Sequence, residues 1–182
     1  MSQKGIKHFG FSLLELVLVI FIISFLVAVL VPKLNELNDD AHASAVRLTM
    51  TSYRAAVNLA HGLWESSGRE GKGSVLKGYG EHNLIMSSAG WPVGVVDYTR
   101  SARNRKISSA TTCVKLWNAL LKDSAPLVSA TDKKGFSYLA EYTNGHCRYR
   151  YRNSQDDLRI EYDLKSGRVE LLSDSEESGV GQ

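Results

Sequence analysis

One carboxylate stands alone in the most apolar stretch of the sequence. Glu15 is the only ionisable residue between Phe11 and Val31, a run that reads FSLLELVLVIFIISFLVAVLV. A charge at the centre of a lipid bilayer costs roughly 2.5–3.5 kcal/mol on insertion scales, and less towards the interface. Near a helix N-terminus a carboxylate gains about 0.3–1 kcal/mol, which explains why this charge is tolerated. It does not explain why a charge is present, so Glu15 calls for a functional explanation.

The run that holds Glu15 is long enough to cross a membrane. As a helix rising about 1.5 Å per residue, residues 11–31 reach roughly 32 Å, against a hydrocarbon core of about 30 Å. The apolar region of a secretory signal peptide has about 7–15 residues and is followed by a small-x-small cleavage site. Here Val31-Pro32-Lys33 follows instead. We therefore expect the segment to be retained as a membrane span.

Charge predicts the orientation of this span. Residues 1–10 carry Lys4 and Lys7 and no acid, whereas residues 33–40 carry one lysine against three acids. The positive-inside rule then predicts that residues 1–10 are cytoplasmic and that the chain from about residue 33 lies outside. In an exported domain the two cysteines, Cys113 and Cys147, are expected to pair. Such a bridge closes about 35 residues and contributes roughly 4 kcal/mol in the chain-entropy model.

The residues around Glu15 resemble a known processing signal. Gly10-Phe11-Ser12-Leu13-Leu14-Glu15 follows a short basic leader and opens an apolar helix. This combination resembles the class III signal of type IV prepilins, which pseudopilins of type II secretion share. Pro32, at position 22 of the presumed mature chain, matches a proline that the family often shows. The resemblance covers roughly residues 4–35.

The resemblance implies a processing route and a set of partners. A membrane-embedded prepilin peptidase is expected to cut between Gly10 and Phe11 and to methylate the new amine of Phe11. Glu15 of one subunit is then expected to pair with that amine on the next, which sets the axial register of a filament. The implied partners are other pilin subunits, the peptidase and an inner-membrane assembly platform. The implied location is the inner membrane before assembly and an extracellular pilus or periplasmic pseudopilus afterwards.

The rest of the chain predicts an α+β fold. Apolar residues at alternating spacings of three and four extend the helix from Phe11 to about Ser66, with a kink or local melting at Pro32. The expected buried stripe is Ala43, Val46, Met50, Tyr53, Val57, Ala60 and Trp64, and the expected opposite face is Arg47, Thr51, Arg54, Asn58, His61 and Glu65. Residues 68–110 predict a loop-rich connector, and residues 113–122 predict a short amphipathic helix.

Four strands are expected to complete the domain. Residues 136–142 and 146–152 flank Asn144-Gly145, a strong hairpin signal, and residues 158–164 and 168–172 flank a second turn. We therefore expect the long N-terminal helix to pack on a C-terminal antiparallel β-sheet of about four strands, the pilin-like roll. The expected organisation is a cleaved leader of residues 1–10, a membrane helix of residues 11–31 and an extracytoplasmic domain of residues 32–182. Residues 173–182 are expected to form a flexible acidic tail.

Other candidate sites are weaker. Arg148, Arg150 and Arg152 alternate with tyrosines on one predicted strand, which indicates either a solvated sheet face or a patch for an anionic ligand such as DNA. A basic loop holds Arg100, Arg103, Arg105 and Lys106. The formal net charge of +3 is too small to indicate nucleic-acid binding by itself. The scattered histidines and the Asp156, Asp157 and Asp163 carboxylates predict no metal site, and we expect no cofactor and no enzyme.

Several functions remain open on the sequence. The leading one is a structural subunit of a type IV pilus that serves adhesion, surface attachment or motility. About 35 residues follow Cys147, which departs from the C-terminal disulfide loop of major pilins and favours a minor pilin, as in a mannose-sensitive-haemagglutinin-like pilus. The alternatives are a type II secretion pseudopilin, and a DNA- or surface-binding module mounted on a pilus. A membrane-anchored periplasmic protein with no filament role is disfavoured by Glu15.

Overall fold

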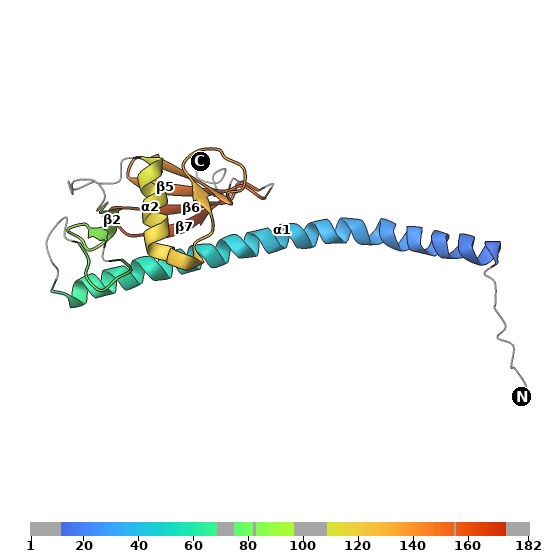
Figure 1. Cartoon of the computed structure of the whole chain (residues 1–182), viewed down its shortest axis with the longest axis horizontal. Coiled ribbons are helices and arrows are strands. Elements are labelled where there is room, and N and C mark those ends of the chain that lie inside the picture. The colour runs from blue at the N-terminus through green and yellow to red at the C-terminus, as the bar shows by residue number, and fades with distance from the viewer. Residues whose placement is uncertain (1–11, 69–74, 82, 97–108, 155, 174–182) are drawn as a thin grey trace, which may run out of the picture. The chain divides into compact units, whose positions relative to one another are not determined.

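The computed structural model describes residues 12–68, 75–81, 83–96, 109–154 and 156–173, without the side chains of residues 32, 34–39 and 123 (Figure 1). Gly10 and Phe11, the basic loop at residues 100–106 and the tail beyond Ser173 lie outside these ranges. The chain divides into two compact units, Met1–Asp40 and Ala41–Gln182.

Helix α1 spans Leu13–Ser66 and belongs to both units. In the first unit its residues Leu13–Val31 have a mean hydropathy of 3.1, and none of them is buried. The helix continues through Pro32, so the local melting expected there does not occur. Proline lacks the N–H that would donate to the carbonyl one turn before it, which removes one helical hydrogen bond. Whether the proline also bends the helix stays a prediction.

In the second unit α1 is amphipathic, as predicted. Val46, Tyr53, Val57, Ala60 and Trp64 are buried, and Ala43 and Met50 pack against the same core. The helix ends where the sequence indicated, with the Ser67 N–H donating to the Leu63 carbonyl at 3.0 Å. Burial of one face along six turns stabilises this part of the helix more than intrinsic helix propensity can.

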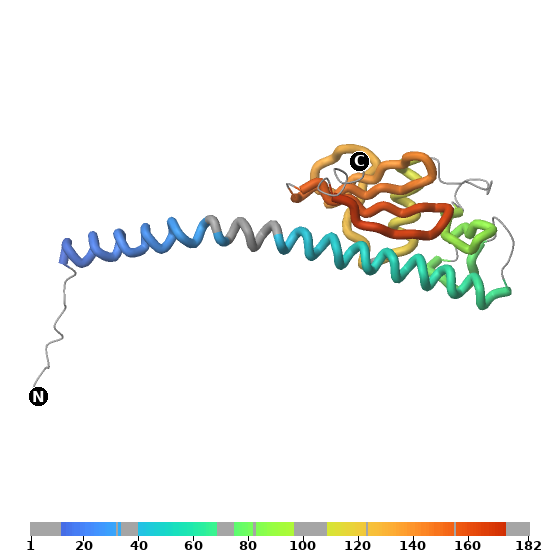
Figure 2. The backbone as a smooth tube through the Cα atoms, turned by 180° about the vertical axis from the view of Figure 1, so that it is seen from behind, coloured from blue at the N-terminus to red at the C-terminus, as the bar shows by residue number. Residues whose placement is uncertain are grey.

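The sheet of the second unit has five strands in the order β3-β4-β5-β6-β7. They are β3 (Val128–Ser129), β4 (Tyr138–Thr143), β5 (His146–Tyr151), β6 (Arg159–Asp163) and β7 (Val169–Leu172). Strands β4 to β7 form the two expected hairpins and are antiparallel, as Figure 2 lets the reader follow. Strand β3 pairs parallel to β4, so the prediction of about four strands, all antiparallel, was wrong at this edge.

The backbone angles of the β4–β5 turn explain why Asn144-Gly145 predicted a hairpin correctly. Asn144 has φ 49° and Gly145 has φ 87°, the pair of positive values that a two-residue type I′ turn requires. Asparagine and glycine adopt this backbone conformation at the lowest steric cost. The turn fixes the register, which pairs Thr143 with His146 and alternates the side chains of β5 between the two faces of the sheet.

The remaining elements are a small hairpin and a second helix. Strands β1 (Leu84–Met86) and β2 (Pro92–Val95) pair antiparallel, and α2 (Ala110–Leu121) is followed by the short 3₁₀ helix η1 (Lys122–Ser124). Helix α2 lies across one face of the sheet, seen from its two sides in Figures 1 and 2. The core between the helices and this face is aromatic: the Tyr53 ring lies 5.3 Å from Trp117 and 5.6 Å from Tyr149, centroid to centroid.

Candidate assembly site

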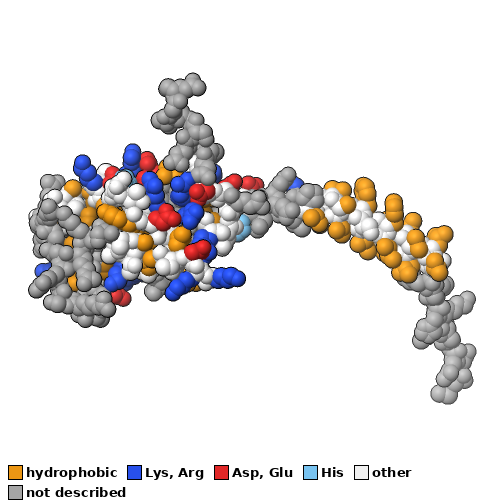
Figure 3. All heavy atoms as spheres, turned by 90° about the horizontal axis from the view of Figure 1, so that it is seen from above, with side chains coloured by type: hydrophobic (Ala, Val, Ile, Leu, Met, Phe, Trp, Pro, Cys, Tyr) orange, Lys and Arg blue, Asp and Glu red, His pale blue; other side chains and the backbone are white. Residues whose placement is uncertain are grey.

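Glu15 lies in the first turn of α1 with its side chain exposed. The turn is closed by the Leu16 N–H, which donates to the Ser12 carbonyl at 3.1 Å. Every other residue of Leu13–Val31 is uncharged, and Figure 3 shows hydrophobic side chains along the described part of this segment. The carboxylate is therefore a single charge at the start of a wholly apolar helix surface.

This apolar surface has no protein cover within the described chain. Leu13 is 80% exposed and Phe21 is 73% exposed. Burying one large apolar side chain is worth about 1.5–3 kcal/mol, so a run of them in water is strongly unfavourable. Lipid or other helices would provide a more favourable environment for this segment than water does. By length and composition it can cross a bilayer, which agrees with the membrane span expected from the sequence.

The exposed face of α1 in the second unit is a second surface that the sequence analysis missed. Exposed small and apolar residues recur along it at spacings of four and three: Ala41, Ala45, Leu48, Ser52, Ala55, Leu59 and Gly62. Leu48 is 70% exposed and Leu59 is 59% exposed. We call these seven positions the outer stripe. A solvated helix face is normally rich in charge, and this one is not.

Arg47, Arg54 and Glu65 flank the outer stripe rather than interrupt it. Nη2 of Arg54 donates to the Val169 carbonyl of β7 at 2.7 Å, so this guanidinium turns towards the sheet. A repeat of small residues lets another helix approach closely. The signal for this surface was present in the sequence as a second run of small residues, offset from the buried stripe.

His61 is not on the solvent face that the sequence predicted. Its ring stacks on Trp91 at a centroid distance of 3.9 Å, and its Nδ1–H donates to the Gly90 carbonyl at 2.7 Å. Trp91 stands directly before β2, in a segment that carried no clear periodicity. The prediction was wrong because helix periodicity says nothing of which loop covers the flank of a helix.

Cys113 and Cys147 are joined by a disulfide in the structure. The bond ties α2 to β5 with a Cα–Cα distance of 5.7 Å, and both residues are fully buried. The Tyr149 hydroxyl donates to the Cys113 carbonyl at 3.0 Å, beside the bridge. The disulfide therefore fastens the second helix to the centre of the sheet, against the aromatic core.

Burial keeps the core phenols neutral. Removal from water raises the pKa of Tyr53, Tyr149 and Tyr162 well above the usual value, and that of Tyr138 to about 12. Each ionised phenolate would have to be desolvated in this apolar setting. The cluster is a packing core, and it offers no proton at neutral pH.

Arg148 and Arg150 of β5 lie on the outer face of the sheet, Arg152 follows directly after the strand, and each of the three has a carboxylate partner. Arg148 pairs with Glu161, and Arg152 pairs with Asp132 and also donates to the Lys133 carbonyl. Nη2 of Arg150 lies 3.5 Å from Oε1 of Glu141. These partners offset much of the positive charge that an anionic ligand would need. The arrangement favours the solvated face over the anionic-ligand patch.

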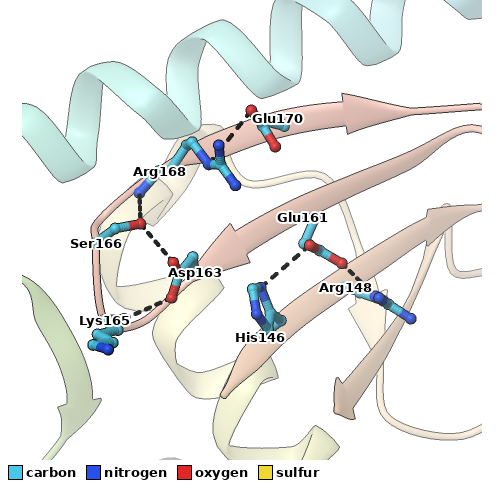
Figure 4. A network of polar contacts seen from close by, with 8 residues as sticks. All are labelled: His146, Arg148, Glu161, Asp163, Lys165, Ser166, Arg168 and Glu170. Carbon is cyan, nitrogen blue, oxygen red and sulfur yellow. Dashed lines mark hydrogen bonds and ion pairs between the residues drawn. The ribbon is translucent and has the colours of Figure 1, made fainter. Parts of the chain in front are cut away.

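Glu161 is the centre of this polar face (Figure 4). One of its oxygens meets Nε of Arg148, and the other lies 3.2 Å from Nδ1 of His146, close enough for an ion pair once the imidazole is protonated. The register of the sheet sets Glu141, Arg148, Glu161 and Glu170 side by side across four strands. Cross-strand pairs of opposite charge stabilise a sheet by about 0.2–1 kcal/mol each.

Asp163 and Asp157 each have a partner close by in the chain. Asp163 accepts hydrogen bonds from the Lys165 N–H and the Ser166 hydroxyl, which shapes the β6–β7 turn. Partial burial opposes its ionisation, but these bonds and nearby His146 outweigh it and lower the pKa of Asp163. Asp157 lies 3.2 Å from Arg159. In the part of the chain that the structure describes, no three His, Cys, Asp or Glu side chains form a metal-binding group.

Each unit therefore has one candidate assembly surface: Glu15 with the apolar helix surface around it in the first, and the outer stripe in the second. Pro32 lies within α1, and its side chain is not described. Gly10 and Phe11, the expected processing residues, fall outside the described residues. No protein-family model, curated protein or solved structure matches this chain.

Proposed function

We propose that this chain is a subunit of an extracellular filament of the type IV pilin kind, held in the inner membrane as a precursor before assembly. One observation carries the proposal. Glu15 is the single charge in the first nineteen residues of α1, Leu13–Val31, and none of these residues is buried. Membrane anchoring alone accounts for the apolar residues. It gives no reason for a carboxylate among them.

Filament assembly supplies that reason. Cleavage between Gly10 and Phe11 on the cytoplasmic side leaves the subunit anchored and creates a positive amine on Phe11. The glycine lets the backbone enter the peptidase in an extended form without a side-chain clash. In the filament core the Glu15 carboxylate meets the Phe11 amine of a neighbouring subunit. Two charges that are costly alone are then paired in an apolar medium, which sets the axial register.

The outer stripe gives the proposal independent support. A filament subunit has to bury helix surface against its neighbours on the outside of its own folded domain. Leu48 and Leu59 are exposed apolar side chains on a face that is otherwise made of small residues. This face accommodates close helix packing without the desolvation of charged groups. We assign it to contacts with neighbouring subunits.

A minor subunit that serves adhesion or surface attachment fits better than the main shaft subunit. Strands β6 and β7 follow Cys147 and complete the sheet, so the disulfide does not close a C-terminal loop of the major-pilin kind. DNA binding is not part of the proposal, because Arg148, Arg150 and Arg152 each pair with a carboxylate.

The N-terminus of the membrane-extracted protein tests the proposal. Intact mass and N-terminal analysis are compared between strains with and without the prepilin peptidase. We expect a chain that begins at N-methylated Phe11 in the first strain and an unprocessed chain in the second. A Gly10→Leu variant should stay unprocessed in both, while a matched Gly5→Leu variant should be cut normally. If Met1 or the full leader persists in both strains with the wild-type protein, the proposal is wrong.

A further inference from the structure

An open pocket of about 450 Å³ lies between α2 and the segment that leads into β1. Its lining residues are Glu81, Asn83, Val95, Lys115, Asn118, Ala119 and Lys122. Helix α2 contributes Lys115 and Asn118 one turn apart, and Lys122 follows directly after the helix. The volume lies within the range of about 300–1,000 Å³ that is typical of small-molecule sites.

Lys122 is held in a backbone conformation that favours glycine. Its φ is 49° and its ψ is −132°, at the junction of α2 and η1. Non-glycine residues at such angles lower the stability of a protein and persist where the surroundings fix them, often at binding sites. Lys122 is therefore costly for the fold, while its side chain lines the pocket. This combination points to a task for the ammonium group.

Gly80 leaves room for that side chain. A Cβ atom at Gly80 would lie 3.4 Å from Cε of Lys122 and 3.6 Å from the Ala119 carbonyl oxygen. The lysine stem thus passes closely over a residue that has no side chain of its own. Both distances are ordinary van der Waals separations, so the lysine stem runs beside Gly80 without crowding.

Hydrogen bonds hold the walls of the pocket in place. The buried Tyr79 hydroxyl donates to the Leu120 carbonyl of α2 at 2.9 Å. The Val96 N–H donates to the Asn83 carbonyl at 2.8 Å, and the Lys122 N–H donates to the Asn118 carbonyl. The lining residues therefore stand on a fixed backbone, and the pocket does not have to form when a ligand arrives.

The lining groups select the chemistry of a ligand. Lys115 and Lys122 bring two positive charges to the lining, which favours an anionic ligand. The Glu81 carboxylate opposes any second negative charge on that ligand. Among the described residues, neither Lys122 nor Glu81 takes part in an ion pair that would occupy it. The amides of Asn83 and Asn118 can donate to and accept from hydroxyl groups.

We propose that this pocket binds an acidic sugar, with its carboxylate on Lys122 and its hydroxyl groups on Glu81 and the two asparagines. A doubly charged phosphate fits less well, because Glu81 repels a second negative charge and the described lining residues include no arginine that could bind it in two places. The inference goes beyond the filament proposal and does not depend on it.

Calorimetric titration of the full chain in detergent micelles with glucuronate tests this inference. We expect saturable binding that Lys122→Gly weakens by about tenfold or more, since a charge-assisted hydrogen bond is lost. Because glycine relieves the strain, the melting temperature of this variant should not fall. Lys165→Gly, at an exposed lysine of the β6–β7 turn, is the matched control and should bind as the wild type does.

Two further probes separate the groups of the ligand. Glucose lacks the carboxylate and acetate lacks the hydroxyl groups, so each should bind at least about tenfold more weakly than glucuronate. Equal binding of glucose, or of acetate, would overturn the assignment of the pocket. So would an absence of saturable glucuronate binding, or binding that Lys122→Gly leaves intact. Loss of binding in Lys165→Gly to the same extent would reduce the effect to surface charge and would also overturn the proposal.

Discussion

Between Leu13 and Val31 no side chain of α1 is buried, whereas between Val46 and Trp64 a residue in every turn reaches the core. Both stretches belong to one helix, and both are rich in apolar residues. The second stretch has a sheet and a second helix of its own chain to cover one face. The first has no such cover among the described residues. The comparison teaches that burial in the monomer separates residues that stabilise the fold from residues that the proposed function assigns to assembly.

The largest expected effect on the free energy of unfolding comes from replacing one aromatic residue of the second stretch with alanine, and the same replacement in the first stretch is the comparison. Tyr53→Ala removes a fully buried ring and should lower the free energy of unfolding of the domain by about 3–5 kcal/mol. Phe21→Ala should leave that free energy unchanged, because the ring touches no core. Urea denaturation followed by near-ultraviolet circular dichroism measures both. An equal loss in the two variants would abolish the distinction.

Loss of the disulfide should come next. A double variant Cys113→Ala and Cys147→Ala should lower the free energy of unfolding by about 2–4 kcal/mol, because it frees the unfolded chain between α2 and β5. The midpoint of urea denaturation measures the change. Wild-type protein treated with reductant should shift by a similar amount, and the double variant should not respond to reductant. An unchanged midpoint in the double variant would show that the bridge is dispensable.

Alkaline pH should destabilise the folded domain through the aromatic core that covers the second stretch. The raised pKa values of Tyr53, Tyr149 and Tyr162 mean that the folded state keeps protons that the unfolded state loses above about pH 10. Stability should therefore be constant below that pH and fall above it, by about 1.4 kcal/mol per pH unit for each tyrosine. The midpoints of urea denaturation, measured in a series of buffers between pH 8 and 11, test this expectation. A flat profile would contradict the burial of the phenols.

The smallest effect on stability, and a clear one on assembly, is expected on the outer stripe. Ala55→Glu lies on the exposed face of α1 and should change the free energy of unfolding by less than about 0.5 kcal/mol. It should nevertheless lower incorporation into filaments, since it adds a charge to a helix-packing surface. Asn153→Glu, in an exposed loop, is the control and should assemble normally. Equal incorporation of the two variants would remove the outer stripe from the interface.

The parts of the fold that sequence predicted correctly are those with a repeated physical signal. The buried stripe of α1 has a helical period over six turns, and only one face of it can reach the core. Strands β5 and β6 alternate apolar and polar residues, and Asn144-Gly145 marks one turn unambiguously. The α+β class and the membrane-length helix follow from these signals together.

The parts that sequence missed have short or non-local causes. Strand β3 has two residues, Val128 and Ser129, which is too few for any period. Helix α2 begins at Ala110 rather than Cys113, although Ser109 and Thr112 carry the pattern of a capping box that could have located its start. The pocket beside α2 has Lys122 in its lining, and the strained backbone of that residue is not revealed by any sequence spacing. The outer stripe could be recognised as a separate surface only when the structure showed which face of α1 is buried.

The incorporation of a Glu15→Val variant into sheared filaments tests the central claim most directly. The account predicts that this variant is stable, is processed to Phe11 and stays in the membrane fraction, yet is lost from the filaments. Leu16→Val, a neighbouring change that keeps the segment apolar and the carboxylate in place, should be incorporated at the wild-type level. Normal amounts of the Glu15→Val protein in the sheared fraction would contradict the claim that Glu15 sets the register of assembly.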